Sequence, residues 1–153
     1  MEIQIIDYSA ENKAAIKTLN IEWLEKYFEV EPIDTLQLSD PELEIIAKGG
    51  SIYYAKSNDL IVGTATLLKI DATSYELGKM AVTESYQGFG IGQKLLVHCI
   101  AEAKKLGAKK IILYSNTVLS TALNLYRKHG FIEDDLDKAH YKRANIKMKL
   151  ELK

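Results

Sequence analysis

Hydrophobic residues cluster in seven short stretches that have the length of β-strands. They lie at residues 2–8, 51–56, 60–70, 75–82, 110–114, 131–133 and 141–152. The last stretch is the clearest, because apolar and polar residues alternate through most of it. The stretches between 51 and 82 are separated only by polar turns at 57–59 and 71–73, so we expect an antiparallel meander there.

Apolar residues at steps of three and four predict four helices between these strands. We expect one helix from Ser9, as its N-cap, to about Tyr27; a short one from Ser39 or Asp40 to Lys48; a long one from the glycines near 90 to Leu106; and a last one that contains Ala122 and Tyr126 and ends at Gly130. Pro32 interrupts the first helical pattern, and residues 34–40 are expected to form a connecting segment.

The long helix connects the predicted strands 75–82 and 110–114. A strand–helix–strand unit of this kind places its two strands parallel. The predicted fold class is therefore α+β: a mixed, mostly antiparallel sheet of about seven strands flanked by helices, with one parallel pair. The chain of 153 residues has the length of one domain, and we expect a single domain over residues 1–153.

Composition and charge exclude several classes of function. The net charge of −1 provides no basic field for nucleic acid and no polybasic patch for a membrane surface. No apolar run is long enough to span a bilayer, and the N-terminus has no signal-peptide pattern. The single cysteine, Cys99, excludes an internal disulfide and suits a reducing compartment, so we expect a cytoplasmic protein. The three histidines form no zinc signature, and we expect no metal.

The sequence from Tyr75 to Leu96, YELGKMAVTESYQGFGIGQKLL, combines a strand, a glycine-rich turn and the start of the long helix. Its alternate glycines leave backbone N–H groups uncovered by side chains, and a helix that starts there adds unpaired N–H groups and the positive end of its dipole. This combination predicts a cradle for a phosphate or pyrophosphate. The dinucleotide fingerprint fails in both registers, and the P-loop fails because Leu95 follows Lys94 where serine or threonine is required. Without a ligand, the same pattern would be a tight strand-to-helix turn.

Two motifs resemble those of one enzyme family. The pattern Gln-x-x-Gly-x-Gly at Gln87, Gly90 and Gly92 closely resembles the acyl-CoA pyrophosphate motif of the GNAT superfamily of N-acetyltransferases. The segment ALNLYRKHGF, residues 122–131, is similar to the A-x-x-L-Y-x-K-x-G-F segment that follows the fifth strand in that family. The motifs stand in the family's order, and the resemblance covers essentially the whole chain.

The resemblance implies a fold and an activity. The fold is the GNAT fold, in which the two parallel strands splay apart at the cofactor cleft. The activity is transfer of an acetyl group from acetyl-CoA to a primary amine of a small molecule or a protein. A non-catalytic acyl-CoA-binding module on the same fold is the alternative.

The resemblance also assigns residues to the cofactor. The backbone at Met80, Ala81 and Val82 would hold the pantetheine arm. The residues that would contact the pyrophosphate or its surroundings are Gln87, Gly88, Phe89, Gly90, Ile91, Gly92 and Gln93. Asn116 is the candidate partner of the pantetheine amide, although it stands ten residues before Tyr126 where many members have seven.

Acyl transfer from a thioester to an amine needs an unprotonated amine, a polarised carbonyl and a protonated leaving thiolate. Tyr126 matches the family's general acid, because a tyrosine of pKa ~10 can protonate a thiolate whose pKa is ~8.5. Glu76 stands where carboxylates act as general base in a number of members, often through water. Without a catalytic role, Tyr126 would be a core tyrosine and Glu76 a solvent-facing strand residue.

The resemblance places the acceptor amine between the N-terminal helices and the loop before the last strand. The candidate substrate-binding residues there are Tyr27, Phe28 and Tyr141, beside Glu29, Glu31 and His140. Asp134 and Asp135 would suit a cationic amine, and are otherwise part of a solvated surface loop. Many relatives pair through their last strands, so a homodimer is compatible with the resemblance.

Overall fold

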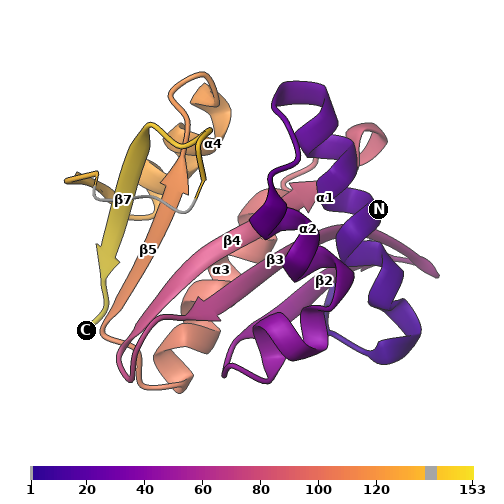
Figure 1. Ribbon diagram of the computed structural model, residues 1–153, viewed down its shortest axis with the longest axis horizontal. Helices are drawn as coiled ribbons and strands as arrows, with labels where there is room; N and C mark the ends of the chain where they lie inside the picture. The colour runs from indigo at the N-terminus through magenta and orange to yellow at the C-terminus, as the bar shows by residue number, and fades with distance from the viewer. Residues whose placement is uncertain (1, 137–140) are drawn as a thin grey trace.

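A seven-stranded mixed sheet forms the centre of a computed structural model that describes residues 2–136 and 141–153 (Figure 1). The strands are β1 (Gln4–Asp7), β2 (Ser51–Ser57), β3 (Leu60–Lys69), β4 (Ser74–Val82), β5 (Lys110–Ser115), β6 (Ile132–Asp134) and β7 (Ile146–Glu151). Their order across the sheet is β1-β2-β3-β4-β5-β7-β6, and among the described strands only β4 and β5 pair in parallel. The predicted α+β class, the meander and the parallel pair are confirmed.

The helices are α1 (Lys13–Tyr27), α2 (Pro32–Ser39), α3 (Ile91–Lys105) and α4 (Ser120–Lys128). The expectation that residues 34–40 form a connection is wrong, because most of this segment lies in α2. Pro32 occupies the first turn, where the N–H that proline lacks would be unpaired anyway. The carboxylate of Asp34 accepts the backbone N–H of Glu31 at 2.9 Å and closes that turn. The short helix expected before Gly49 is reduced to a π-helical turn at Glu42–Ile46.

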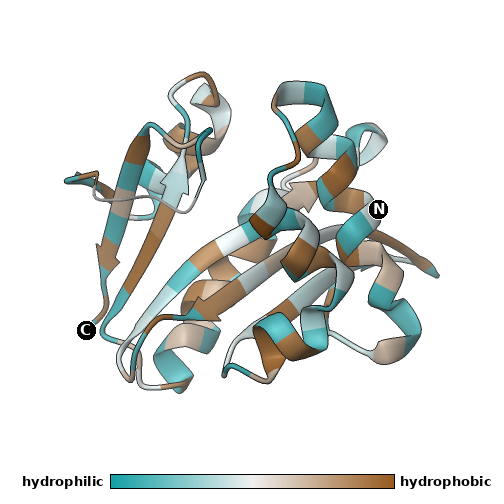
Figure 2. Cartoon of the chain, in the orientation of Figure 1, coloured by the Kyte–Doolittle hydropathy of each residue, from teal (hydrophilic) through white to brown (hydrophobic). Residues whose placement is uncertain are grey.

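Helices cover both faces of the sheet. Tyr53 of β2 packs in the larger hydrophobic core with Leu95 of α3, whereas its neighbour Tyr54 packs in a smaller core with Ile16 of α1. Neighbouring residues of a strand point to opposite faces, so α3 and α1 lie on opposite faces of the sheet. The helix α4 joins the larger core through Leu123. Figure 2 shows the alternation of hydrophobic and hydrophilic residues along β7 that the sequence predicts.

The strands β4 and β5 are paired at one end only. Their ladder runs from Ser74 opposite Lys110 to Glu76 opposite Ile112, and beyond it the strands diverge (Figure 1). Thr64 of β3 lies opposite Ala81 of β4, and Thr66 lies opposite Gly78. The chain advances by two residues on β3 and by three on β4 between these pairs, so β4 contains a β-bulge. The bulge contains Lys79, whose φ is 47°. An extra residue bends its strand, so the bulge contributes to the divergence.

The last strand is shorter than predicted. It begins at Ile146, and residues 141–145 form a loop instead of continuing the strand to Tyr141. Long-range hydrogen bonds hold this loop: the backbone N–H of Asn145 donates to the Ser115 carbonyl at 3.0 Å, and the side chain of Asn145 accepts from the Thr117 N–H at 2.9 Å. The loop therefore lies beside the end of β5, at the opening between the diverging strands.

Candidate active site

The glycine-rich turn joins the end of β4 to α3 and is open to solvent. Gly88 and Gly90 have φ values of 85° and 80°, which favour glycine over any other residue. A Cβ added at either position would meet no atom within 4 Å, so the space beside this backbone is open. Because α3 begins at Ile91 with Gly90 as its N-cap, its unpaired N–H groups and the positive end of its dipole lie at the same place. The turn has the features of an anion cradle.

A groove of about 760 Å³ begins at this turn and runs between the end of β4 and α4. The residues assigned to the cofactor from the sequence that line it are Met80, Ala81, Val82, Gln87, Gly88, Gly90, Ile91, Gly92 and Gln93. The two that do not are Phe89, whose side chain is 60% exposed, and Asn116. The helix α4 forms the opposite wall, through Thr121, Asn124 and Lys128 among others.

Two glutamines brace the groove near the turn. The side-chain amide of Gln87 donates to the carbonyl of Val82 at 3.0 Å and ties the turn back to the end of β4. Gln93, in the first turn of α3, accepts a hydrogen bond from the ammonium of Lys128 at 3.1 Å. Lys128 therefore places a positive charge at the wall of the groove, close to the glycine turn. Lys128 is the lysine of the second motif, ALNLYRKHGF, and the sequence alone predicted no role for it.

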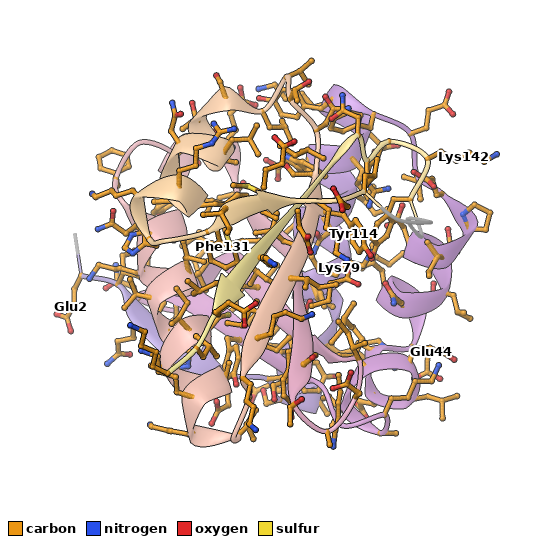
Figure 3. All side chains as sticks on the ribbon, turned by 90° about the vertical axis from the view of Figure 1, so that its left-hand side faces the viewer. Glu2, Glu44, Lys79, Tyr114, Phe131 and Lys142 are labelled. Atoms are coloured by element: carbon orange, nitrogen blue, oxygen red, sulfur yellow. The ribbon has the colours of Figure 1, made fainter. Side chains whose placement is uncertain are left out.

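A second, smaller cavity of about 150 Å³ lies deeper between β4 and β5. Trp23, Met80, Leu119 and Ala122 line both the groove and the cavity, so the two spaces adjoin. The ionisable residues that line the cavity are Glu76, Lys79, Tyr114, Tyr126, Tyr141 and Arg143. Figure 3 shows Lys79 and Tyr114 near one another at the centre of the molecule, on the two diverging strands. The arrangement can bring a ligand in the groove against a reactant in the cavity.

Tyr126 projects from α4 into the wall of the cavity. Its ring packs against Phe131, with the ring centroids 5.8 Å apart, and the side chain is partly buried. Burial raises the pKa of Tyr126 to about 12. The hydroxyl is therefore protonated at neutral pH and available as a donor.

Glu76 is buried at the last position where β4 pairs with β5, with 4% of the residue exposed, so the solvent-facing alternative is wrong. The hydroxyl of Tyr141 donates a long hydrogen bond, 3.4 Å, to Oε2 of Glu76. Burial and the neighbouring carboxylate of Glu76 raise the pKa of Tyr141 well above its ordinary value, so Tyr141 acts here as a donor. A carboxylate and two protonated phenols thus line one cavity.

A buried network of charges lies behind Tyr141. Nζ of Lys79 is 2.7 Å from Oδ1 of Asp34, and the guanidinium of Arg143 contacts both oxygens of Asp34, at 2.7 and 2.9 Å. Arg143 also pairs with Glu31 at 3.2 Å. Burial opposes ionisation of Asp34, but the hydrogen bonds from Arg143 and Lys79 outweigh it and lower its pKa to about 2. Asp34 is therefore ionised at neutral pH.

This network connects the two halves of the sheet across the opening. Asp34 lies in α2 and Glu31 is the residue before this helix, both on the β4 side of the opening. Arg143 lies in the loop beside β5. Oxygens of Glu31 also accept the backbone N–H groups of Lys142 at 2.7 Å and Arg143 at 3.2 Å. The loop 141–145 is therefore held over the cavity by the start of α2.

The other residues assigned from the sequence have different surroundings. Phe28 lines the smaller cavity, whereas Tyr27 is 46% exposed and lines the groove. Asn116 lines the cavity and its amide donates to the Arg143 carbonyl at 2.8 Å, which helps to hold the same loop. His140 lies outside the described residues.

Asp134 and Asp135 lie away from both the groove and the cavity. Asp134, on β6, is within 3.8 Å of Lys147 and 3.9 Å of Lys149, both on β7. Neither Asp134 nor Asp135 lines the groove or the cavity. The sequence did not indicate Lys79, Asp34 and Arg143 as a cluster, because they lie on a strand, a helix and a loop that only the tertiary fold brings together.

Comparisons with known proteins agree on one family. Residues 48–133 match the family model described as "Acetyltransferase (GNAT) domain". The chain is 36% identical over 115 residues to the uncharacterized N-acetyltransferase YvbK of Bacillus subtilis, an alignment that covers 71% of this chain and 74% of YvbK. This match extends beyond the segments that carry the two motifs.

Solved structures share the fold over the whole chain. A GNAT-family acetyltransferase from Staphylococcus aureus has a TM-score of 0.89 and 26% identity, with 99% of this chain and all of that chain covered. A GNAT-family acetyltransferase from Elizabethkingia anophelis, crystallised with acetyl-CoA bound, has a TM-score of 0.69 and 28% identity over 98% of both chains.

The part of the chain that the structure describes contains neither a candidate metal site nor a candidate membrane-spanning helix. No group of three or more histidine, cysteine, aspartate or glutamate side chains there could hold a metal ion. No helix there is both long enough and apolar enough to cross a membrane.

The motifs, the splayed parallel strands, the family model and the relatives together show that this chain belongs to the GNAT superfamily of N-acetyltransferases.

Proposed function

We propose that this protein transfers the acetyl group of acetyl-CoA to a primary amine, with the donor in the groove and the amine in the smaller cavity. The observation that carries the proposal is the junction of the two spaces. They share four lining residues, and Glu76 and Tyr126 both face the inner one. A thioester that reaches this junction from the groove would meet an amine between a carboxylate and a phenol.

The groove suits the donor because its positive features lie at one end. The open backbone of Gly88 and Gly90, the start of α3 and the ammonium of Lys128 would bind the pyrophosphate. The backbone of the apolar segment Met80–Val82 would hold the pantetheine arm as an added strand. Gln87 and Gln93 would fix the turn, through their bonds to Val82 and Lys128.

Glu76 would remove the proton that the amine must lose, directly or through water. The amine nitrogen then attacks the thioester carbonyl carbon, a C–N bond forms, and the C–S bond breaks. The amine gives up one proton and the departing sulfur gains one, so the products are the N-acetyl compound and the free thiol of CoA. The hydroxyl of Tyr141 would orient the Glu76 carboxylate.

Tyr126 would give the hydrogen bond, and then the proton, to the departing sulfur. Its pKa of about 12 keeps the hydroxyl protonated, but transfer to a thiolate whose conjugate acid has a pKa of ~8.5 is then uphill. Proton transfer must therefore accompany C–S cleavage, and the cavity has to bring the two groups into contact first.

The test is amine-dependent release of CoA thiol from acetyl-CoA by the purified protein, with the N-acetyl product identified by mass spectrometry. The proposal predicts thiol release that saturates with amine and an equal amount of acetylated product. Stoichiometric binding of acetyl-CoA without amine-dependent turnover on any amine would contradict it, and would favour the non-catalytic acyl-CoA-binding module.

A further inference from the structure

Glu31, at the start of α2, contacts the loop that borders the smaller cavity, although it lines neither the cavity nor the groove. Resting on the proposed function, we propose that Glu31 is a positioning residue for the acceptor: it pins the loop 141–145 across the opening, and the pinned loop limits the size of the amines that the cavity accepts. The inference depends on how Glu31 holds the loop and on which residues of the loop line the cavity.

The carboxylate of Glu31 contacts the loop at three points. Oε1 accepts the backbone N–H of Lys142 at 2.7 Å, and Oε2 accepts the backbone N–H of Arg143 at 3.2 Å. Oε2 also accepts a hydrogen bond from the guanidinium of Arg143 at 3.2 Å. Hydrogen bonds to a carboxylate are roughly twice as strong as neutral ones. Glu31 therefore fixes the backbone of the loop as well as one of its side chains.

The first turn of α2 is a firm support for these contacts. The backbone N–H of Glu31 donates to Oδ2 of Asp34 at 2.9 Å, and the Asp34 carboxylate binds the same guanidinium of Arg143. Asp34 is fully buried and is also paired with Lys79. Breaking a buried pair is costly, so this turn stays in place if the loop moves.

The loop reaches from this support to the other side of the opening. The side-chain amide of Asn116, which follows β5, donates to the Arg143 carbonyl at 2.8 Å. Between the two supports, Tyr141, Arg143 and Ala144 line the cavity. Lys142 instead has an exposed side chain, which points outward in Figure 3. The pinned loop is thus one wall of the cavity.

This wall yields more easily than the others. The cavity measures about 150 Å³, so with the donor in the groove an amine with a larger body has to displace a wall. The remaining walls belong to β4, β5, α1 and α4, whose backbones are held by the regular hydrogen bonds of the sheet and the helices. The loop lacks such a ladder and depends on the contacts described above, so loosening it enlarges the cavity.

The test compares two pairs of acceptors, each of which presents the same kind of amine on a small and on a large body. The pairs are benzylamine with 4-phenylbenzylamine, and Nα-acetyl-lysine amide with a blocked heptapeptide that has one central lysine. In each pair that the protein acetylates, kcat/KM should be at least tenfold higher for the smaller member. In Glu31→Ala this preference should fall at least fivefold, while the Kd of acetyl-CoA stays within twofold. General damage to the site would instead lower both members alike.

Glu31→Ala keeps the contact between Arg143 and Asp34, so we expect it to fold. Glu31→Gln retains an oxygen that can accept from the loop, and it should have a smaller effect. The matched control is Glu25→Ala, which removes the same charge from an exposed residue of α1 and should leave the size preference unchanged. A preference that Glu31→Ala does not change would overturn the inference.

Amide hydrogen exchange, followed by NMR, tests the pinning without an acceptor. The amides of Lys142 and Arg143 should exchange at least tenfold faster in Glu31→Ala, because their hydrogen bonds to the carboxylate are lost. The amide of Asn145, which donates to the Ser115 carbonyl at 3.0 Å, should change less. Unchanged exchange at Lys142 and Arg143 would show that Glu31 does not hold the loop.

The outcomes separate this inference from the function on which it rests. Equal turnover of the small and large amines by the unmodified protein would refute the size limit and leave the acetyltransferase function intact. Binding of acetyl-CoA with turnover of none of the four, nor of any amine in a wider panel, would refute both.

Discussion

The groove and the smaller cavity adjoin, yet they are built in opposite ways. The groove takes its distinctive features from one continuous segment, the end of β4, the glycine turn and the start of α3, and it is large and open. The cavity is assembled from the end of α1, the middle of β4, the end of β5, the helix α4 and the loop 141–145. Backbone groups dominate the first, and a buried network of paired side chains closes the second.

The difference has a physical reason. A phosphate can be bound by backbone N–H groups, so its site needs glycines and a helix start, which adjacent residues supply. An acceptor amine must be desolvated and its proton removed, so its site needs buried charges, and buried charges need partners from elsewhere in the fold. The first requirement leaves a local motif in the sequence, and the second does not.

The largest expected effect is on the groove. Gly90→Glu should abolish binding of acetyl-CoA, because it adds bulk, negative charge and backbone strain at the cradle. Isothermal titration with acetyl-CoA measures it. The matched control is Gly107→Glu at the other end of α3, where φ is 81° and the surrounding space is equally open. Similar affinities in the two variants would mean that the turn is not the phosphate site.

The next effect is on catalysis in the cavity. Tyr126→Phe should lower kcat by about 10²–10⁴-fold, the usual contribution of a positioned acid, and leave the Kd of acetyl-CoA within twofold. Steady-state kinetics and titration separate the two quantities. Tyr75→Phe, which removes a buried hydroxyl from the core outside the cavity, is the control and should keep near-normal turnover. Normal turnover in Tyr126→Phe would remove its role as the acid.

The third effect is on stability. Asp34→Asn should destabilise the protein by about 3 kcal/mol at pH 7, because it leaves Lys79 and Arg143 buried beside a neutral group. Urea unfolding measures it. Glu44→Gln removes a pair in which Lys48 is largely exposed, and should cost less than about 0.5 kcal/mol. Equal effects would show that the buried network does not hold the two halves together.

The loss of stability caused by Asp34→Asn should depend on pH, and the sign of that dependence is defined. The folded-state pKa of Asp34 is about 2, below its unfolded value, so its stabilisation is present above about pH 4 and is lost as the pH falls toward 2. The gap in unfolding free energy between the protein and Asp34→Asn should therefore narrow from pH 4 downwards. A gap that stays constant from pH 7 to pH 2.5 would mean that Asp34 is not ionised in the folded protein.

The smallest effect concerns the contact between Tyr141 and Glu76. Tyr141→Phe keeps the ring against Lys79 and Arg143 and removes only the hydroxyl that donates to Glu76. Loss of a hydrogen bond to a carboxylate disfavours its ionised form, so the acidic limb of the kcat/KM profile should move to higher pH by roughly half a unit. Tyr141→Leu, which also removes the ring, should lower stability as well. A profile that does not move would mean that Tyr141 does not orient Glu76.

Sequence patterns anticipated the sheet and the groove because both depend on local signals. The alternation in β7, the short turns of the meander and the glycines before α3 each act within a few residues. The helix α2 was missed because Pro32 was interpreted as a helix breaker, although proline is favoured in a first turn. Tyr141 was named from the resemblance, but the segment around it was assigned to a strand.

The charged residues of the cavity had no such signal. Lys79 lies between glycine and methionine on a strand, and Arg143 lies in a loop beside Lys142. Their common partner Asp34 stands 45 residues before the first and 109 before the second. The bulge that turns Lys79 inward and the hydrogen bonds that fold the loop over the cavity both depend on tertiary packing. A single sequence therefore does not reveal them.

The most direct test of this account is a thermal-shift titration of the purified protein with acetyl-CoA, run beside ATP and NAD. At 100 times its dissociation constant, a ligand that binds only the folded state adds about 2.7 kcal/mol of stability. The account predicts a concentration-dependent shift with acetyl-CoA, its loss in Gly90→Glu, and its retention in Gly107→Glu. No shift with acetyl-CoA, or a larger one with ATP or NAD, would contradict the assignment of the groove and the function proposed from it.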